Sequence, residues 1–241
     1  LFRSGRQGSS STIDVYANVP KVSLSINGTP LGSKTPDEIK KLTWTVLLRD
    51  GDNYIDAKAI VNGKTIADHV VVHFAATDAI TGFSPGNTLY VNVGAGTQYT
   101  DHEKDIWVDD QPYQKGSYGY TGGTPGMLNI KSLITNTDDT PLFYTYQNGI
   151  KQYRADMPQG NYEIGLCFVE PDRIKAGERV FNVDINQSRA ISNLDLAAVA
   201  GSGVAVKKKF IVKVTGDRGI TISFIPVKGS PVLSGLSINT L

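Results

Sequence analysis

The sequence of 241 residues contains a single cysteine, Cys167, which excludes an internal disulfide and a metal cluster held by several thiolates. An excess of one charge is also absent, because 24 Lys and Arg residues oppose 23 Asp and Glu residues and leave a formal net charge of +1. A chain without a net field has no general attraction for nucleic acid or anionic membranes. No apolar run approaches the roughly 20 residues of a membrane-spanning helix. We therefore predict no nucleic-acid partner and no membrane span.

Alternation of apolar and polar residues is what the sequence does contain, beginning with residues 13–17 and 22–26. Such alternation is typical of strands that bury one face. Asn27-Gly28 and Asn62-Gly63 readily take the positive φ angles of type I′ turns and predict hairpins. The first 76 residues are therefore predicted to form a small β-sandwich of immunoglobulin type. Its further elements are expected to be strands at 44–48, 54–60 and 66–74 and a brief helix at 35–41.

A second module follows a change in composition. Small and turn-forming residues without alternation predict a linker at 77–87. The region 88–241 then alternates again and predicts a larger, jelly-roll-like β-sandwich, so the fold class is all-β. The segment 94–136 is rich in Gly, Tyr, Asp and Thr and is expected to form long loops, where binding sites tend to lie. Strands are expected at 89–93, 142–147, 152–157, 162–169, 179–185, 204–214, 220–225 and 232–238.

Catalytic and metal sites are not predicted. Glycoside hydrolysis needs two carboxylates held about 5 to 9.5 Å apart across one sugar, and no such pair is evident. The acidic residues of the loop segment favour solvated surface charge, with a structural calcium ion as the alternative. These residues are Asp101, Glu103, Asp105, Asp109 and Asp110.

Other reactive side chains have simpler interpretations, and no cofactor is expected. His69 and His73 fall in a predicted strand, which would hold them about 13 Å apart, too far to share one metal ion. Cys167 lies between Leu166 and Phe168 and is expected to be a buried, inert thiol. Lys207 begins a run of three lysines that predicts a charged edge strand.

Four ordered segments give the second module a resemblance to the malectin family of carbohydrate-binding domains. They are 89–94 (LYVNVG), 160–170 (GNYEIGLCFVE), 177–186 (GERVFNVDIN) and 232–239 (VLSGLSIN). The resemblance covers residues 89–241 and implies a sugar ligand, an oligosaccharide or polysaccharide, without a catalytic group. The loop aromatics and amides suit that ligand, because aromatic faces stack on pyranoses and planar polar groups bind hydroxyls.

The sugar pocket of animal malectin is only partly matched. The resemblance assigns Tyr118 to a tyrosine that contacts glucose, and it places Asn148, with Tyr146 two residues away, at a second tyrosine. Asp172 and Arg173 replace the aromatic pair that clamps the sugar, and Gly229 lies where the family has an acidic ligand. A different and more polar site is therefore expected. Its candidate residues are Tyr118, Tyr120, Tyr146, Asn148, Asp172 and Arg173.

The first module resembles the accessory immunoglobulin-like domain that follows the barrel in bacterial family 2 glycoside hydrolases. The resemblance rests on 13–32 (IDVYANVPKVSLSINGTPLG), Trp44, 51–59 (GDNYIDAKA) and 67–70 (ADHV). This domain followed by a malectin-like one is typical of the C-terminal end of a β-galactosidase-like enzyme. The sequence begins with Leu1 in place of methionine and shows no signal peptide. We therefore expect it to be a piece of a longer precursor.

Two functions follow from this arrangement. The first is a non-catalytic, weakly sugar-binding region that keeps its parent glycosidase on polysaccharide, with the upstream catalytic domain as partner and a periplasmic or cell-surface location. The second is a structural module that buttresses the barrel or forms a dimer interface, with a degenerate sugar site.

Overall fold

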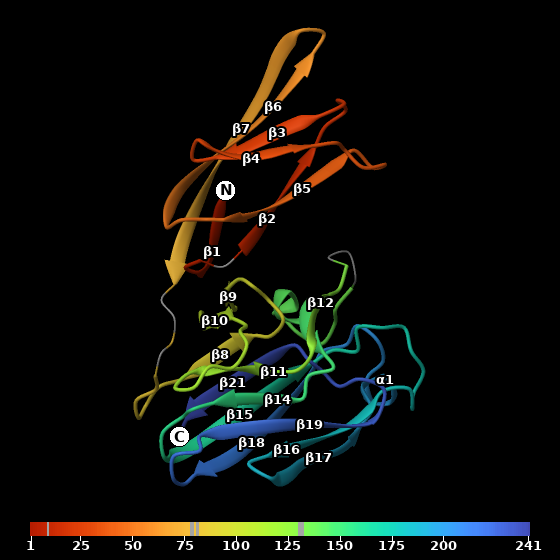
Figure 1. Cartoon of the computed structure of the whole chain (residues 1–241). Coiled ribbons are helices and arrows are strands. Elements are labelled where there is room, and N and C mark those ends of the chain that lie inside the picture. The colour runs from red at the N-terminus through yellow and green to blue at the C-terminus, as the bar shows by residue number, and fades with distance from the viewer. Residues whose placement is uncertain (9, 78–79, 81, 130–132) are drawn as a thin grey trace. The chain divides into compact units, whose positions relative to one another are not determined.

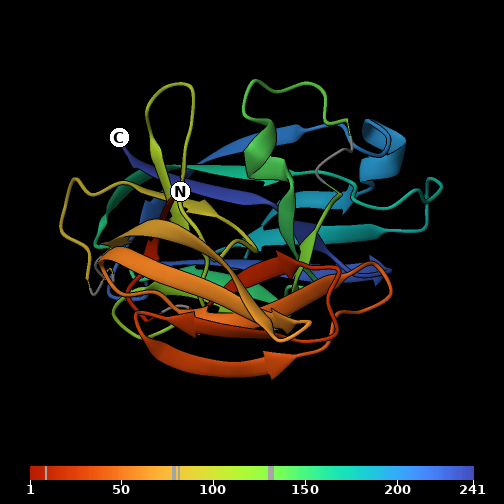
Figure 2. The same ribbon diagram turned by 90° about the horizontal axis from the view of Figure 1, so that it is seen from above.

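A computed structural model of the chain describes residues 1–8, 10–77, 80, 82–129 and 133–241. The chain divides into two compact units, Leu1–Ala79 and Ile80–Leu241. Figures 1 and 2 draw the first unit in red to orange and the second from yellow to blue. Strands dominate both units, which confirms the all-β class. Within the described residues, no helix has both the length and the apolar character to cross a membrane.

The domain limits predicted from the sequence, 1–76, 77–87 and 88–241, stay a prediction. Residues 78, 79 and 81 of the predicted linker lie outside the described residues.

The first unit is a sandwich of two unequal sheets. One sheet has five strands in the order β1-β7-β6-β3-β4, and the other pairs β2 with β5. The bounds are β1 (Phe2–Arg6), β2 (Ser10–Tyr16), β3 (Val22–Ile26), β4 (Thr29–Lys34), β5 (Lys41–Leu47), β6 (Gly51–Val61) and β7 (Lys64–Thr77). The alternating residues fill the core as expected: Val22, Leu24 and Ile26 are 3%, 1% and 8% exposed. Neither β1 nor β4 was among the strands predicted from the sequence.

Turns in the first unit are largely as predicted. Asn27 and Asn62 have φ angles of 50° and begin the β3–β4 and β6–β7 hairpins. The helix predicted at 35–41 is wrong. There the Asp37 carboxylate accepts hydrogen bonds from the backbone N–H groups of Ile39 (3.0 Å) and Lys41 (2.8 Å), which closes a turn instead of capping a helix. Lys40 takes a left-handed φ of 65° before β5 begins.

The second unit packs a six-stranded sheet, β18-β15-β21-β8-β10-β9, against a five-stranded sheet, β11-β14-β19-β16-β17. A three-stranded sheet, β12-β13-β20, accompanies them. The bounds are β8 (Leu89–Asn92), β9 (Tyr99–Thr100), β10 (Ile106–Asp109), β11 (Tyr118–Thr121), β12 (Thr124–Met127), η1, a 3₁₀ turn (Thr140–Phe143), β13 (Thr145–Asn148), β14 (Gln152–Ala155), β15 (Gly160–Phe168), β16 (Val180–Ile185), β17 (Ser188–Leu194), α1 (Leu196–Val199), β18 (Val206–Val214), β19 (Ile220–Lys228), β20 (Val232–Leu233) and β21 (Gly235–Thr240).

Most predicted strands of this unit are present, with three differences. Residues 142 and 143 belong to η1 rather than to a strand, and β17 was not anticipated. The segment 94–136, expected to consist of loops, contains four short strands, β9 to β12, and its residues 130–132 lie outside the described residues. Lys207 lies on β18 at the edge of the six-stranded sheet, as expected. Cys167 is 4% exposed, and burial raises the pKa of its thiol to about 12, as expected of an inert cysteine.

Asp110 connects several strands of the second unit. Its Oδ1 accepts hydrogen bonds from the Tyr153 hydroxyl (2.8 Å) and the Gln111 backbone N–H (2.9 Å). Its Oδ2 accepts from the Gly94 backbone N–H (2.8 Å) and from Gln147 Nε2 (2.9 Å). All four partners donate, so the ionised carboxylate fits the network. Asp110 therefore holds β13, which carries Gln147, and β14, which carries Tyr153, to the loops after β8 and β10.

Replacing Asp110 with Asn should lower the stability of the second unit at pH 7.5 by about 1–3 kcal/mol, because the new amide N–H₂ would face donors. Denaturant unfolding followed by Trp107 fluorescence measures this, in a Trp44→Phe background that removes the other tryptophan. Asp217→Asn, at an exposed turn, is the control and should change nothing. Equal stabilities for the two variants would contradict the role given to Asp110.

Candidate functional site

Strand β13 presents two predicted site residues on one face. Gln147 points inward and is fully buried, whereas its neighbours Tyr146 and Asn148 are half-buried and exposed. Because side chains alternate along a strand, Tyr146 and Asn148 share the outward face. The bond from Gln147 to Asp110 anchors the strand from behind. The sequence thus places a tyrosine and an amide side by side at the surface of the second unit.

The position of the Tyr146 ring depends on Gly126. The two residues are paired across β12 and β13, and a Cβ atom at position 126 would lie 2.5 Å from Tyr146 Cζ and 2.8 Å from its hydroxyl oxygen. Real Cβ atoms essentially never lie this close to another atom, so the Tyr146 ring would have to shift. Glycine at 126 therefore leaves room for the ring to lie across β12.

The loop after β15 holds a compact cluster of charges. Arg179, at 7% exposure, donates through Nη1 to Glu170 Oε1 and through Nη2 to Asp172 Oδ2 (2.8 Å). The Asp172 backbone N–H also donates to Glu170 Oε1, at 3.1 Å. Glu170 is 1% exposed, and its other carboxylate oxygen is buried with no hydrogen-bond partner among the described residues. The positive charge of Arg179 therefore neutralises one of the two neighbouring negative charges, and its guanidinium holds both carboxylates in position.

Electrostatics link Tyr146 to this cluster. Burial is the main reason that the pKa of Tyr146 is raised, and the negative charge of Asp172 adds to the shift. Burial likewise raises the pKa of Glu170, against the opposing effect of hydrogen bonds from the Asp172 backbone and of Arg179. Tyr146, Asp172, Glu170 and Arg179 thus form one neighbourhood, although they come from β13, the loop after β15 and the residue preceding β16.

A cleft of about 440 Å³ opens beside the charge cluster. That volume lies within the range of small-ligand pockets, about 300–1,000 Å³. Its described lining consists of Leu128, Asn129, Leu133, Glu170, Pro171, Arg173, Ser202 and Gly203. Ser202 and Gly203 are held against the loop, because Ser202 Oγ donates to the Asp172 carbonyl and the Gly203 N–H donates to the Glu170 carbonyl (3.0 Å).

Some predicted site residues lie elsewhere. Tyr118 is 2% exposed and donates its hydroxyl proton to the Asp109 carbonyl (2.8 Å), so its ring is buried here, and its contact with sugar stays a prediction. Tyr120 is half-buried against the core and does not line the cleft. Arg173 lines the cleft, whereas Tyr146 and Asp172 adjoin it through the charge cluster. Asn148, on the face of Tyr146, stays a candidate.

Glu170, Arg179 and Ser202 were not anticipated from the sequence. Glu170 and Arg179 both lie in segments that resemble the malectin family, where they could pass for scaffold residues. The sequence did contain a signal for this ion pair. A glutamate follows the apolar run 164–169 directly, and an arginine precedes the apolar alternation of 180–185 directly. Charged residues beside buried segments need partners of opposite charge.

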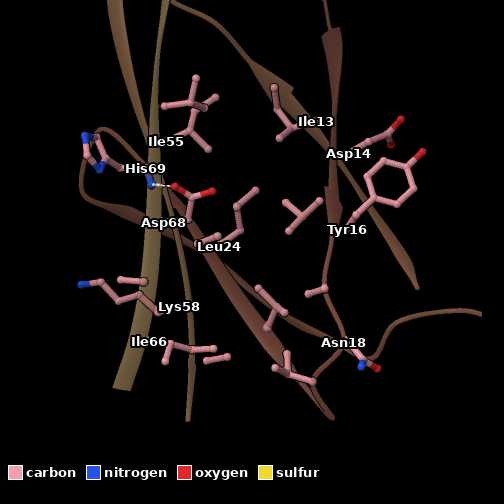
Figure 3. Close-up of a pocket in the computed structure, with 18 residues that line it drawn as sticks. Ile13, Asp14, Tyr16, Asn18, Leu24, Ile55, Lys58, Ile66, Asp68 and His69 are labelled. Carbon is pink, nitrogen blue, oxygen red and sulfur yellow. Dashed lines mark hydrogen bonds between the residues drawn. The ribbon is translucent and has the colours of Figure 1, made fainter. Parts of the chain in front are cut away.

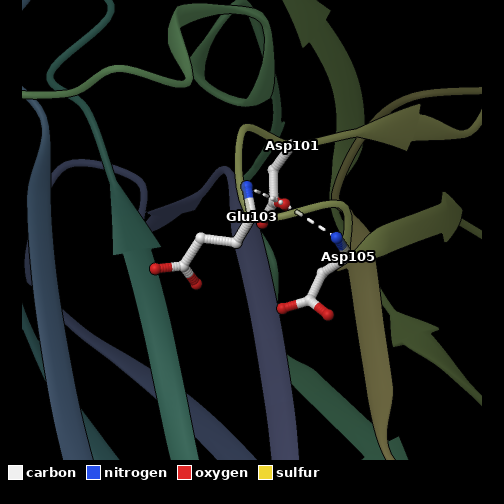
Figure 4. Close-up of side chains that lie close together, drawn as sticks. All are labelled: Asp101, Glu103 and Asp105. Carbon is white, nitrogen blue, oxygen red and sulfur yellow. Dashed lines mark hydrogen bonds between the residues drawn. The ribbon is translucent and has the colours of Figure 1, made fainter.

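The acidic loop residues are more buried than predicted. Asp101 is 8% and Asp109 6% exposed, which contradicts their interpretation as solvated charge. Asp101 accepts hydrogen bonds from Trp107 Nε1 (2.9 Å) and from the backbone N–H groups of Glu103 (3.0 Å) and Asp105 (2.8 Å), as Figure 4 shows for the latter two. Carboxylate oxygens of Asp101, Glu103 and Asp105 approach within 4.8 Å of one another. The Asp101 carboxylate therefore closes this loop over Trp107.

A second hollow belongs to the first unit and has a different character. Its volume is about 420 Å³, and its lining is largely apolar, with Val15 among the residues. Figure 3 labels four further apolar residues of the lining, Ile13, Leu24, Ile55 and Ile66. It lies between β2 and the strands β6 and β7, where the two-stranded sheet covers only part of the five-stranded one. Tyr16, in its lining, is 67% exposed.

Family models match both units. The model of the malectin domain matches residues 87–235, and the model of a domain of unknown function, DUF4982, matches residues 8–67. The crystal structure of the β-glucuronidase of Bacteroides uniformis is 31% identical, with a TM-score of 0.63, and the match covers 100% of this chain and 28% of that one. These findings confirm the resemblance to the C-terminal region of a family 2 glycoside hydrolase.

Two further proteins are similar to this chain at lower sequence identity. The ANX1 ectodomain of Arabidopsis thaliana is 15% identical, with a TM-score of 0.52 over 96% of this chain and 81% of that one, and supports the fold alone. The kinesin-like protein KIN-14E of Oryza sativa is 24% identical over 162 residues, which are 63% of this chain and 14% of that protein. The chain thus spans a small part of two of these relatives.

Replacing Gly126 with Ala should destabilise the second unit by about 1–3 kcal/mol, because the added methyl group displaces the Tyr146 ring. Denaturant unfolding followed by Trp107 fluorescence measures the loss. Gly96→Ala is the matched control, since a Cβ there meets nothing within 4 Å.

A double-mutant cycle makes the test specific to the ring. In a Tyr146→Ala background, Gly126→Ala should cost much less, because the space is then vacant. A cost that is the same in both backgrounds would show that Gly126 does not make room for Tyr146.

Proposed function

The chain belongs to the malectin domain family, and from that membership we propose that its second unit binds carbohydrate weakly, as a non-catalytic accessory region of a glycoside hydrolase. The cleft beside Arg173 is the observation that supports this function most directly. It is large enough for a sugar unit, and it combines apolar walls at Leu128 and Leu133 with the polar side chains of Asn129, Arg173 and Ser202. Orienting polar groups on an apolar wall are typical of sugar sites.

The absence of catalysis is supported by how the carboxylates near the cleft are used. Glu170 and Asp172 both bind Arg179, and the second oxygen of Glu170 is buried. A glycosidase needs one carboxylate as proton donor and another as nucleophile or base, each free to reach the glycosidic bond. In this loop both carboxylates are instead paired with the guanidinium of Arg179.

The parent enzyme is proposed from the whole-chain match. We propose a family 2 glycoside hydrolase, of β-galactosidase or β-glucuronidase type, whose catalytic domain precedes this region and acts in the periplasm or at the cell surface. Weak sugar binding suits such a tail. Tethering raises the effective concentration of the catalytic domain near its polymer, so even a millimolar affinity contributes.

A second candidate function is favoured by the apolar hollow of the first unit. An open groove between partly covered sheets, lined by Val15, Leu24 and Ile55, would bury apolar surface if another domain docked there. We propose the catalytic domain of the same parent as its occupant. This function is compatible with sugar binding by the second unit, but by itself it requires none.

Isothermal titration of the 241-residue chain with a panel of plant and host oligosaccharides tests carbohydrate binding. We expect saturable heat for at least one glycan. Ser202→Trp should abolish that heat by filling the cleft, whereas Ser188→Trp, at an exposed position on β17, should leave it unchanged.

The outcomes separate the two functions. Silence across the panel would leave only the docking function. Heat that survives Ser202→Trp would move the sugar site away from the cleft. Turnover of chromogenic galactosides or glucuronides by the purified chain would contradict the non-catalytic assignment.

A further inference from the structure

The described lining of the cleft lacks aromatic side chains. Its apolar members are Leu128, Leu133 and Pro171, and Leu133 is 81% exposed. Neutral pyranoses are commonly held by stacking on aromatic faces, so this cleft must draw its selectivity from other groups. The candidates are the polar and charged side chains at its wall.

Of the two charged side chains in the wall, Arg173 is the one without a partner among the described residues. Glu170 also lines the cleft, but Arg179 binds one of its oxygens and the other is buried. Arg173 is exposed and forms no hydrogen bond or ion pair with any described residue. Its position just after Asp172 is defined, because Asp172 is held to Arg179 by its side chain and to Glu170 by its N–H. A positioned loop therefore presents to the cleft a guanidinium that pairs with none of the described residues.

We infer that the cleft selects a carbohydrate that bears a carboxylate, a uronic acid, with Arg173 as the partner of that carboxylate. The inference rests on the proposed sugar-binding function and names the ligand class. A guanidinium presents parallel N–H donors that match the two oxygens of a carboxylate, which gives direction as well as charge. The exposed aliphatic surface of Leu133 can cover the C–H side of the ring, while Ser202 lies at the same wall.

The negative charge of Asp172 limits which anionic ligands can bind in the cleft. With Glu170 and Arg179 it leaves the charge cluster one unit negative, and its own side chain is 55% exposed. An anionic ligand without its carboxylate at Arg173 would therefore be repelled. Because these charges lie near solvent, salt screens them over about 10 Å at 0.1 M, and the affinity should fall as salt rises.

Titration of the 241-residue chain with three ligands tests the inference. The ligands are a trisaccharide of galacturonic acid, the same trisaccharide with its carboxyl groups reduced, and an oligosaccharide of the same length that contains glucuronate. We expect at least one uronate ligand to bind more tightly than its reduced form. Arg173→Gln should weaken uronate binding about 10- to 100-fold, as expected for loss of a charge-assisted hydrogen bond. Arg173→Lys should restore only part of the affinity.

Lys175→Gln is the matched control, because this exposed cation lies two residues away and does not line the cleft. It should leave affinity unchanged. Thermal unfolding should show that Arg173→Gln is as stable as the unmodified chain, as expected for an exposed side chain.

The inference and the proposed function fail in different ways. Equal binding of the uronate and reduced forms, or uronate binding that Arg173→Gln does not weaken, would overturn the inference and leave carbohydrate binding intact. Binding of only neutral glycans from the wider panel would do the same. Binding of no glycan at all would overturn both.

Discussion

The arrangement of the second unit's surface depends on Arg179, which is nearly buried between two carboxylates. Removing a guanidinium and a carboxylate from water is costly, and the attraction compensates only when geometry and hydrogen bonds are good. Here the guanidinium reaches Glu170 and Asp172, and the Asp172 backbone completes the set. That requirement defines the path of the loop after β15. Once the path is defined, Arg173 faces the cleft, and the carbonyls of Glu170 and Asp172 hold Gly203 and Ser202 beside it.

The neighbouring strand β13 is positioned from its opposite face. Gln147 binds Asp110, which also holds Tyr153 and the Gly94 backbone, so the strand is anchored through its inward face and not through its outward-facing side chains. Tyr146 can then lie across Gly126 without supporting the strand. Separating the anchoring residues from the surface residues leaves the surface free to vary.

Sequence reasoning succeeded where one face of a strand is buried. The spacing of Val22, Leu24 and Ile26 alone predicts a strand. The two Asn-Gly pairs likewise predict the positive φ angles of the hairpin turns. It failed at 35–41, where the local pattern of a helix start lost to hydrogen bonds of the Asp37 side chain. It also failed for the acidic loop: Asp101 and Asp109 are polar by type but buried by packing. A residue's type says what its burial would cost, whereas its burial depends on partners that are distant in the sequence.

The sequence by itself determined the all-β class, most strands and the likeness to two accessory modules, because these depend on local periodicity and on ordered motifs. The tertiary structure decided which aromatic residues are available. Tyr118 matches a sugar-contacting residue in the family alignment, yet it is buried with its hydroxyl on the Asp109 carbonyl. Tyr146, two residues from its aligned position, lies beside the charge cluster. Arg173 was a candidate from the sequence, and the tertiary structure decided that it lines the cleft while Arg179, just before β16, pairs with the nearby carboxylates. Pairing of this kind is set by packing between segments, which no local pattern records.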